Sequence, residues 1–394
     1  MHRRRTSLLA GAALLAVAAC GAEEPEATDP APTEVSASPE PSSQDPDAAT
    51  VSAPETTTQT ATPTATEEAA PLEPLVVVAD SLDVPWGLAV VEDGTAALVG
   101  ERDTAQVWRV PLEGERELVA TVPGVRPDSE GGLLGLVVPP DGDGSQFFVY
   151  ATTAEDNRVL RIDTSGGEPQ VEVVLDGIPK AGNHNGGRLA FGPDGHLYVS
   201  TGDALDVGLA QQPGSLGGKI LRITEDGDPA PGNPDPDSPV WSLGHRNVQG
   251  LGWDSQGRMW ASEFGQNALD ELNLIEPGGN YGWPLYEGPG GDPAYVDPVL
   301  TWTTDQASPS GLAVGPDDAI YVAALRGQAL WRVQVDADGV AGEPERLLTD
   351  HGRLRSVVVD DAGALWVLTS NTFRGSPAED DDRLLRLDPA ELRR

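Results

Sequence analysis

His184 lies between two asparagines in the stretch AGNHNGGRLAFGPDGHLYVSTGD, residues 181–203. An imidazole gains and loses a proton near neutral pH, so it can act as a general base. The glycines and asparagines around it disfavour a strand interior, whereas RLAF and HLYVST, joined by Pro-Asp-Gly, predict a β-hairpin. His184 is therefore placed on a loop that leads into a strand, where functional residues are common. Because loop histidines are more often ordinary surface residues, the rest of the chain must decide its role.

Other polar and aromatic residues stand just before, or early in, apolar segments elsewhere in the chain. They are Glu130, Arg246, Asn247, Gln249, Trp302, Thr304, Arg353 and Arg355. A guanidinium pairs with carboxylates and stacks on flat rings. Since the net charge is −38, an anionic ligand would need such a local cluster of arginines. The residues are up to roughly 225 positions apart, so only a fold that returns repeatedly to one point could gather them.

One pattern recurs six times: a small residue, a short apolar strand, an Asp/Gly turn and a second apolar strand. The copies begin at Gly87, Gly132, Gly187, Gly250, Gly311 and Ser356, roughly 45 to 63 residues apart, each followed by a third strand such as QVWRV or LLRL. This period is typical of β-propeller blades. We predict an all-β fold over residues 75–394, a six-bladed β-propeller of four-stranded antiparallel blades with the polar residues facing its axis. A β-sandwich is the alternative, disfavoured because the copies are so alike.

Three local features refine this prediction. No stretch of the domain shows sustained helical periodicity. Long insertions at 204–218 and 226–247 are predicted as loops of blades three and four. A strand near residues 75–78 is a candidate to complete the last blade.

The first 74 residues predict export and anchoring rather than a folded domain. Residues 1–20 contain three arginines, an apolar run and then Cys20, which is typical of a signal peptide. The ending VAAC resembles a bacterial lipobox, which would place a lipid on Cys20; an ordinary signal peptide is the alternative. Residues 21–74 are rich in Pro, Thr and acids, without aromatic residues, and predict a disordered acidic tether. We therefore expect a lipid-anchored, extracytoplasmic protein that contacts the membrane only through the anchor.

The composition argues against nucleic acid as a partner and against disulfide bonds within the chain. The strong negative charge argues against nucleic-acid binding. Cys20 is the only cysteine, so no intrachain disulfide can form.

Three motifs carry a family resemblance: HNGGRLAFGPDGHLYVSTGD, LGHRNVQGLGWDSQGRMWASEFG and DELNLIEPGGNYGWP. In this order, within six blades, they resemble the soluble quinoprotein sugar dehydrogenases, the glucose/sorbosone dehydrogenase family, which uses pyrroloquinoline quinone (PQQ) and calcium. The resemblance runs from Val84 to Leu384.

The resemblance implies a role for each matching position. His184 would be the catalytic base and Asp203 the carboxylate that orients it. The cofactor side would comprise Arg246, Asn247, Gln249, Trp302, Thr304, Arg353 and Arg355. The backbone carbonyls of Gly265 and Gln266 would bind the calcium that touches the quinone, and Glu271 and Tyr281 match a second, structural calcium site.

Two cofactor-site positions depart from the family pattern. Glu130 stands where the family usually has glutamine, and Arg326 where it has lysine. A carboxylate beside a tricarboxylate cofactor is unfavourable unless it is protonated, paired with an arginine or turned away. Arginine keeps the charge of lysine but changes its reach and geometry.

The leading hypothesis is oxidation of aldose sugars, or sugar aldehydes, to lactones or acids, with electrons passed to an external acceptor. A second is a propeller that binds a sugar or envelope partner and has lost the cofactor, which Glu130 and Arg326 would favour. A third, a calcium-dependent lactonase, would need several acidic ligands on the axis, where the loops instead offer Arg, Asn and Gln.

Overall fold

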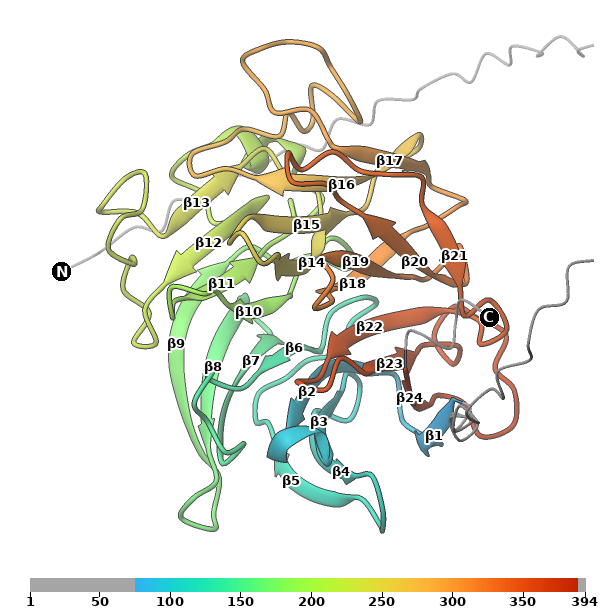
Figure 1. Cartoon of the computed structure of the whole chain (residues 1–394). Coiled ribbons are helices and arrows are strands. Elements are labelled where there is room, and N and C mark those ends of the chain that lie inside the picture. The colour runs from blue at the N-terminus through green and yellow to red at the C-terminus, as the bar shows by residue number, and fades with distance from the viewer. Residues whose placement is uncertain (1–74, 389–394) are drawn as a thin grey trace, which may run out of the picture. The chain divides into compact units, whose positions relative to one another are not determined.

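Six small antiparallel sheets stand around a central axis in the structure, a computed structural model that describes residues 75–388 (Figure 1). Within these residues every sheet has four strands, which confirms the predicted six-bladed propeller. The expected signal peptide, Cys20 and the tether at 21–74 lie outside the described residues.

Blades one to three follow one another along the chain, each as an up-and-down meander. Blade one comprises β2 (Pro85–Val91), β3 (Ala96–Glu101), β4 (Gln106–Pro111) and β5 (Glu117–Thr121). Blade two comprises β6 (Leu133–Val137), β7 (Gln146–Thr152), β8 (Asn157–Asp163) and β9 (Gln170–Ile178). Blade three comprises β10 (Leu189–Phe191), β11 (Leu197–Ser200), β12 (Lys219–Ile223) and β13 (Val240–Leu243).

The later blades repeat this order until the last, which takes its outer strand from the start of the domain. Blade four comprises β14 (Val248–Trp253), β15 (Met259–Glu263), β16 (Leu269–Ile275) and β17 (Leu300–Thr303). Blade five comprises β18 (Pro309–Val314), β19 (Ala319–Ala324), β20 (Ala329–Gln334) and β21 (Glu345–Leu347). Blade six comprises β22 (Leu354–Val359), β23 (Leu365–Thr369), β24 (Leu384–Leu387) and β1 (Val76–Ala79).

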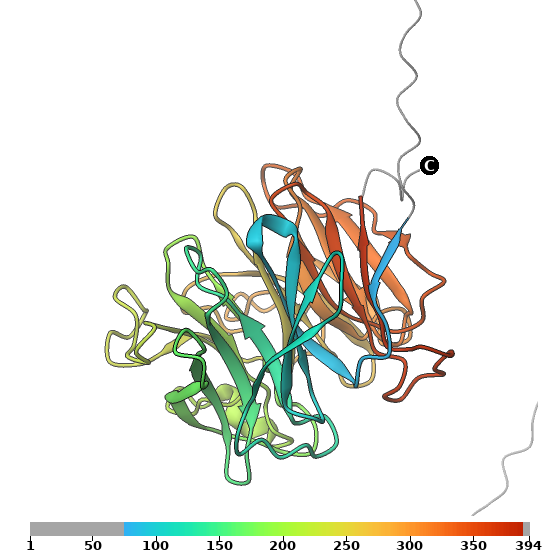
Figure 2. The same ribbon diagram turned by 90° about the horizontal axis from the view of Figure 1, so that it is seen from below.

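The ring is closed by β1, which pairs antiparallel with β24, as Val76 opposite Arg386 shows. Figure 2 shows the blue β1 alongside the red strands of the last blade. The predicted closing strand is thus confirmed.

One prediction about insertions needs correction. The segment 226–247 contains β13, so it carries the fourth strand of blade three and is not an insertion of blade four. The segment begins with many Pro, Gly and Asp residues, which are typical of loops, so the short strand at its end could not be recognised from the sequence. The segment 204–218 is a true insertion and holds η2 (Val207–Gln211), which with η1 (Glu92–Gly94) makes up the helical content of residues 75–388, both 3-10 turns. No helix in this range is long and apolar enough to cross a membrane.

The core is divided among the six interfaces between neighbouring blades, each with its own cluster of buried apolar side chains. Between blades one and two, for example, Leu98 packs with Phe147. Two of the turn aspartates brace the tryptophans of their blades: Asp254 accepts the indole N–H of Trp260, and Asp360 that of Trp366, both at 2.9 Å. This is the structural role expected of turn residues.

The inner strands β2, β6, β10, β14, β18 and β22 contact one another around the axis. In each antiparallel blade, the loop before the first strand and the loop joining the second to the third lie at the same end. Both sets of loops therefore surround one end of the central channel, and this end carries the site.

Candidate functional site

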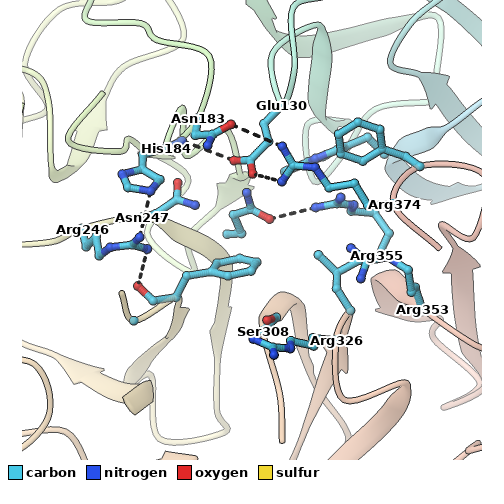
Figure 3. Close-up of a pocket in the computed structure, with 16 residues that line it drawn as sticks. Glu130, Asn183, His184, Arg246, Asn247, Ser308, Arg326, Arg353, Arg355 and Arg374 are labelled. Carbon is cyan, nitrogen blue, oxygen red and sulfur yellow. Dashed lines mark hydrogen bonds and ion pairs between the residues drawn. The ribbon is translucent and has the colours of Figure 1, made fainter. Parts of the chain in front are cut away.

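A pocket of about 320 Å3 opens at this end of the channel (Figure 3). Nine residues singled out from the sequence line it: Glu130, His184, Arg246, Asn247, Gln249, Gly265, Arg326, Arg353 and Arg355. They come from blades two to six, so the predicted convergence on the axis takes place. Among the residues that line the pocket, Glu130 is the one carboxylate.

His184 is held between a carboxylate and a guanidinium. Its Nδ1 lies 2.7 Å from Asp203 Oδ1. Its Nε2 lies 2.8 Å from Arg246 Nη2 (Figure 3). An arginine can only donate, so Nε2 is the acceptor and Nδ1 carries the hydrogen that is donated to Asp203. This tautomer presents the basic lone pair of Nε2 on the pocket side.

Asp203 lies behind His184, fully buried and outside the pocket lining. Its second oxygen accepts the indole N–H of Trp283 at 2.8 Å, and its first also accepts the amide of Leu205 at 2.9 Å. Burial alone would raise the pKa of this carboxyl, but the hydrogen bonds from His184 and Trp283 outweigh it and hold the pKa below its usual range. Asp203 is therefore an anionic orienting group for His184.

The backbone of the histidine loop is tightly constrained. His184 adopts a left-handed conformation, with φ of 59°, which costs free energy unless its surroundings enforce it. Gly202 passes so close that an added Cβ would lie 1.9 Å from the carbonyl oxygen of His184. Asn247 accepts the amide of Gly186 at 2.9 Å from the neighbouring blade. Glycine at these positions is thus a requirement of the close approach.

Guanidinium groups form the opposite side of the pocket. Arg355 is buried and donates to Gln249 Oε1 at 3.0 Å. Burial lowers the pKa of Arg355 to about 9, and burial with the nearby Arg374 lowers that of Arg353. A further arginine, Arg188, stacks over Trp86 at 4.2 Å on the channel side.

Hydrogen-bond donors in this pocket remain unused. Within the described residues, the buried Nε atoms of Arg246, Arg353 and Arg355 have no hydrogen-bond partner. Buried donors without acceptors are costly, so their presence in one pocket fits a ligand that brings several anionic oxygens. PQQ is a flat tricarboxylate, so its carboxylate oxygens could accept hydrogen bonds from these donors.

Glu130 does not face the pocket as an uncompensated charge. Its Oε1 lies 2.7 Å from Nη1 of Arg374, and its Oε2 accepts the amide of His184 at 3.3 Å (Figure 3). Of the three ways in which this carboxylate could be tolerated, the structure shows pairing with an arginine.

Arg326 occupies the open side of the pocket. It pairs with Asp305 at 2.5 Å, and both side chains are largely exposed. Such a pair contributes little to stability, so Arg326 can turn towards a ligand at small cost.

The structure does not bring Trp302 and Thr304 into the pocket lining. Trp302 lies on β17, the outer strand of blade four, and packs against Trp331 in the core between blades four and five. The motif suggested proximity to the cofactor, but an outer strand directs this side chain into the interface between blades. Thr304 follows the same strand, and its carbonyl accepts from Ser308 Oγ at 3.3 Å.

Gly265 and Gln266 lie in the loop between β15 and β16, and Gly265 reaches the pocket. Asp270 accepts the amide of Gly265 at 2.9 Å, and Glu287 accepts that of Gln266 at 2.6 Å. Both amides are thus held by carboxylates, and no hydrogen bond within residues 75–388 uses either carbonyl oxygen. Those residues contain no cluster of three acidic, His or Cys side chains that could hold a metal, so a calcium ion at this loop would depend on main-chain oxygens.

Glu271 and Tyr281 line a second, very small cavity of about 10 Å3 together with Glu263. Burial, and then repulsion from Glu263, raises the pKa of Glu271 to about 8. The Tyr281 hydroxyl donates to Leu274 O at 2.7 Å and accepts from the Glu276 amide at 2.8 Å, so it is occupied by the backbone. The structure brings this pair together, and both oxygens of Glu271 also accept hydrogen bonds, from the Gly288 amide and from Asn273.

Several pocket residues were not predicted from the sequence. They are Trp86, Asn183, Phe264, Ser308, Leu325, Phe373 and Arg374. Phe264, Leu325, Phe373 and Arg374 sit in loops between second and third strands. Counting strand directions would have found these loops, because they share an end with the loops before the inner strands.

The fold and the site define a class: a six-bladed propeller with a histidine–aspartate couple facing a ring of arginines in its axial pocket. The glucose / sorbosone dehydrogenase family matches residues 82–376. The chain therefore belongs to this family, as its motifs predicted.

Individual relatives agree with this assignment. The chain is 31% identical over 336 residues to aldose sugar dehydrogenase YliI of Escherichia coli, covering 75% of this chain and 90% of that protein. It is similar to quinoprotein glucose dehydrogenase B of Acinetobacter calcoaceticus, with 31% identity over 56% of this chain and 54% of that protein. Among solved structures, the PQQ-bound aldose sugar dehydrogenase of Streptomyces coelicolor matches with a TM-score of 0.76 and 48% identity, over 79% of this chain and 96% of that one.

Proposed function

We propose that this protein is a quinoprotein sugar dehydrogenase that oxidises aldose sugars, or sugar aldehydes, to lactones or acids. One observation carries the proposal. His184, with its hydrogen on Nδ1 donated to Asp203, faces a pocket lined by five arginines and by one carboxylate, that of Glu130, which is paired with Arg374. The relatives named as aldose sugar dehydrogenases support the substrate class, and the PQQ-bound relative supports the cofactor.

His184 is the general base in this proposal. A sugar hydroxyl that enters the pocket takes the place of Arg246 at Nε2, and its proton passes to that nitrogen. Asp203 keeps the hydrogen on Nδ1 and stabilises the imidazolium that forms. Arg246 is then free to donate to an oxygen of the ligand.

The arginines and amides would hold PQQ. Arg353, Arg355 and Arg246 offer unused donors to its carboxylates, and Gln249 and Asn247 line the pocket between them. When bound, PQQ would supply a two-electron acceptor for the hydride that leaves the sugar carbon, and the electrons would then go to an external acceptor.

Calcium is the second proposed cofactor. The carbonyl oxygens of Gly265 and Gln266 are hard ligands of the kind that Ca2+ prefers, and a cation there would polarise an adjacent carbonyl. The carboxylates of Glu263 and Glu271 support a structural calcium beside Tyr281, because a cation would offset the cost of burying two acids. Chelation is expected to lower both activity and melting temperature, measured with and without added Ca2+.

Anchoring through Cys20 completes the proposal, supported by the lipobox-like VAAC ending. In a bacterial host, the wild-type chain should enter the membrane fraction and incorporate a labelled fatty acid. Cys20→Ala should do neither, and incorporation by that variant would contradict the assignment.

Reduction of an artificial dye by the full chain, given PQQ, Ca2+ and a panel of aldoses, tests the enzyme. Turnover that requires all three additions is expected. A chain that neither binds PQQ nor turns over would instead be a binding propeller, the alternative that Glu130 and Arg326 favour.

A further inference from the structure

Three blades are tied together at the rim of the pocket by Glu130 and Arg374. Glu130 lies in the loop before β6, and Arg374 in the loop between β23 and β24. Beyond their 2.7 Å ion pair, Arg374 Nη2 lies 3.2 Å from Ser129 Oγ and 3.5 Å from Asn183 Oδ1. Figure 3 shows Glu130, Asn183 and Arg374 side by side at one edge of the cavity.

Arg374 is presented to the rim by its own loop. The ring of Phe373 contacts two guanidinium groups, with its centre 3.8 Å from that of Arg102 and 4.9 Å from that of Arg374. Arg102 is itself buried and pairs with Asp103 at 2.6 Å. The side chain of Arg374 is nevertheless 47% exposed, against 25% for Glu130, so the pair is accessible to a ligand.

The two oxygens of Glu130 have different partners. Oε1 pairs with Arg374, whereas Oε2 accepts the main-chain N–H of His184 at 3.3 Å. His184 is left-handed at this point, so an acceptor on its amide supports an uncommon conformation. Glu130 thus connects a charge at the rim with the backbone of the base.

Electrostatics explains why the two residues belong together. A lone carboxylate at this position would repel an anionic ligand in the pocket that Arg353 and Arg355 line. Arg374 cancels that charge and leaves Glu130 free to hold the amide of His184. Neither effect needs a strong ion pair, which this exposure would not supply.

We propose that Glu130 and Arg374 form a charge-compensated clamp, in which Arg374 neutralises Glu130 so that the pocket accepts a polycarboxylate cofactor, and Glu130 positions His184 through its amide. The clamp deepens the proposed function and rests on it for the identity of the ligand. Both are positioning residues.

The test is a calorimetric titration of PQQ into the full chain in the absence of substrate. Arg374→Ala should weaken binding by about tenfold or more, because Glu130 then faces the ligand unpaired. Glu130→Gln should stay within about threefold of the wild type, and Glu130→Gln with Arg374→Ala should recover most of the loss. Arg109→Ala is the matched control, since Arg109 forms a similar exposed pair with Glu92 at 2.6 Å on blade one. It should bind as the wild type does.

A second readout needs no cofactor. In selectively 15N-histidine-labelled protein, Glu130→Ala should speed exchange of the His184 amide hydrogen by about tenfold or more, as local opening becomes easier. Glu130→Gln should retain protection, because its amide oxygen still accepts. The signal is assigned by its loss in His184→Ala.

Wild-type affinity in Arg374→Ala would overturn the clamp, and so would a double variant that binds as weakly as Arg374→Ala alone. Unchanged exchange in Glu130→Ala would overturn the positioning role. A wild type that binds no PQQ would refute the proposed function instead, and the exchange experiment would still decide whether Glu130 positions His184.

Discussion

The two sides of the pocket are built in different ways. The histidine side, formed by the loops of blades three and four around His184 and Asp203, is largely buried. Hydrogen bonds hold both its backbone and the imidazole of His184. The arginine side, formed by blades five and six with Arg326, Arg353, Arg355 and Arg374, depends on side chains, two of them well exposed. The insertion 204–218, also on the histidine side, is held by a buried lysine. Lys219 donates to the carbonyls of Leu209, Ala210 and Gly217.

This difference matches the two tasks of the site. Proton transfer needs a base held in one geometry before the substrate arrives. Binding of an anion needs donors that can adjust, and exposed guanidinium groups lose little by moving. Substitutions on the histidine side should therefore lower activity, whereas substitutions on the arginine side should lower the affinity for the ligand.

The largest effect should follow from removing the base. His184→Ala is expected to lower kcat by about 10²- to 10⁴-fold, the usual contribution of general base catalysis, while PQQ affinity stays near that of the wild type. Asp203→Asn should also lose activity, because asparagine can stabilise the wrong tautomer. Steady-state kinetics with a parallel PQQ titration measures both. Retention of full kcat in His184→Ala would exclude it as the base.

Stability should next depend on the buried lysine. Lys219→Met removes the donor to three carbonyls, and we expect a loss of about 3 kcal/mol in the free energy of unfolding. Chemical denaturation of the full chain measures it. Lys180→Met, which removes a single contact to the carbonyl of Thr153, serves as the control and should cost about 1 kcal/mol. Equal losses would show that the insertion is not held by Lys219.

The arginine side should respond in affinity rather than in stability, and unequally. Arg355→Ala is expected to weaken PQQ binding by about 2 to 3 kcal/mol, since a buried charge-assisted contact is lost. Arg326→Ala should cost less than about 1 kcal/mol, because its side chain is exposed and paired with Asp305. Calorimetric titration of both variants provides the comparison. A larger loss of affinity in Arg326→Ala than in Arg355→Ala would show that the buried guanidinium is not the stronger anchor of the ligand.

The smallest effect should appear at acidic pH. The folded-state pKa of Asp203 lies below its ordinary value of 3.8, so its ionised form stabilises the fold above that pH. This contribution is lost as the pH falls through the lower, folded-state pKa. Thermal unfolding between pH 6 and pH 3 should therefore show the wild type losing stability relative to Asp203→Asn below about pH 4. Parallel curves would indicate that Asp203 is not an ionised partner.

The fold was accessible from the sequence because each blade repeats one pattern of turn and strand. For the same reason the loops before the inner strands, with His184 and Arg246, could be placed at one pocket. Trp302 could not, because the motif that includes it does not say which strand of a blade it occupies. Arg374 was missed because its partner Glu130 lies 244 positions away, and no local pattern announces an ion pair of that kind. Side-chain choices between distant loops depend on packing that sequence periodicity does not encode.

The pairing of β1 with β24 has a consequence for biogenesis. A ribosome delivers Val76–Ala79 long before Leu384–Leu387, so blade six stays incomplete until β24 has also been made. The ring can be sealed only once β24 is present to pair with β1. A chain cut short before residue 384 would leave β1 and β23 without their shared neighbour. Such a chain would present an open ring to the proteases of protein quality control.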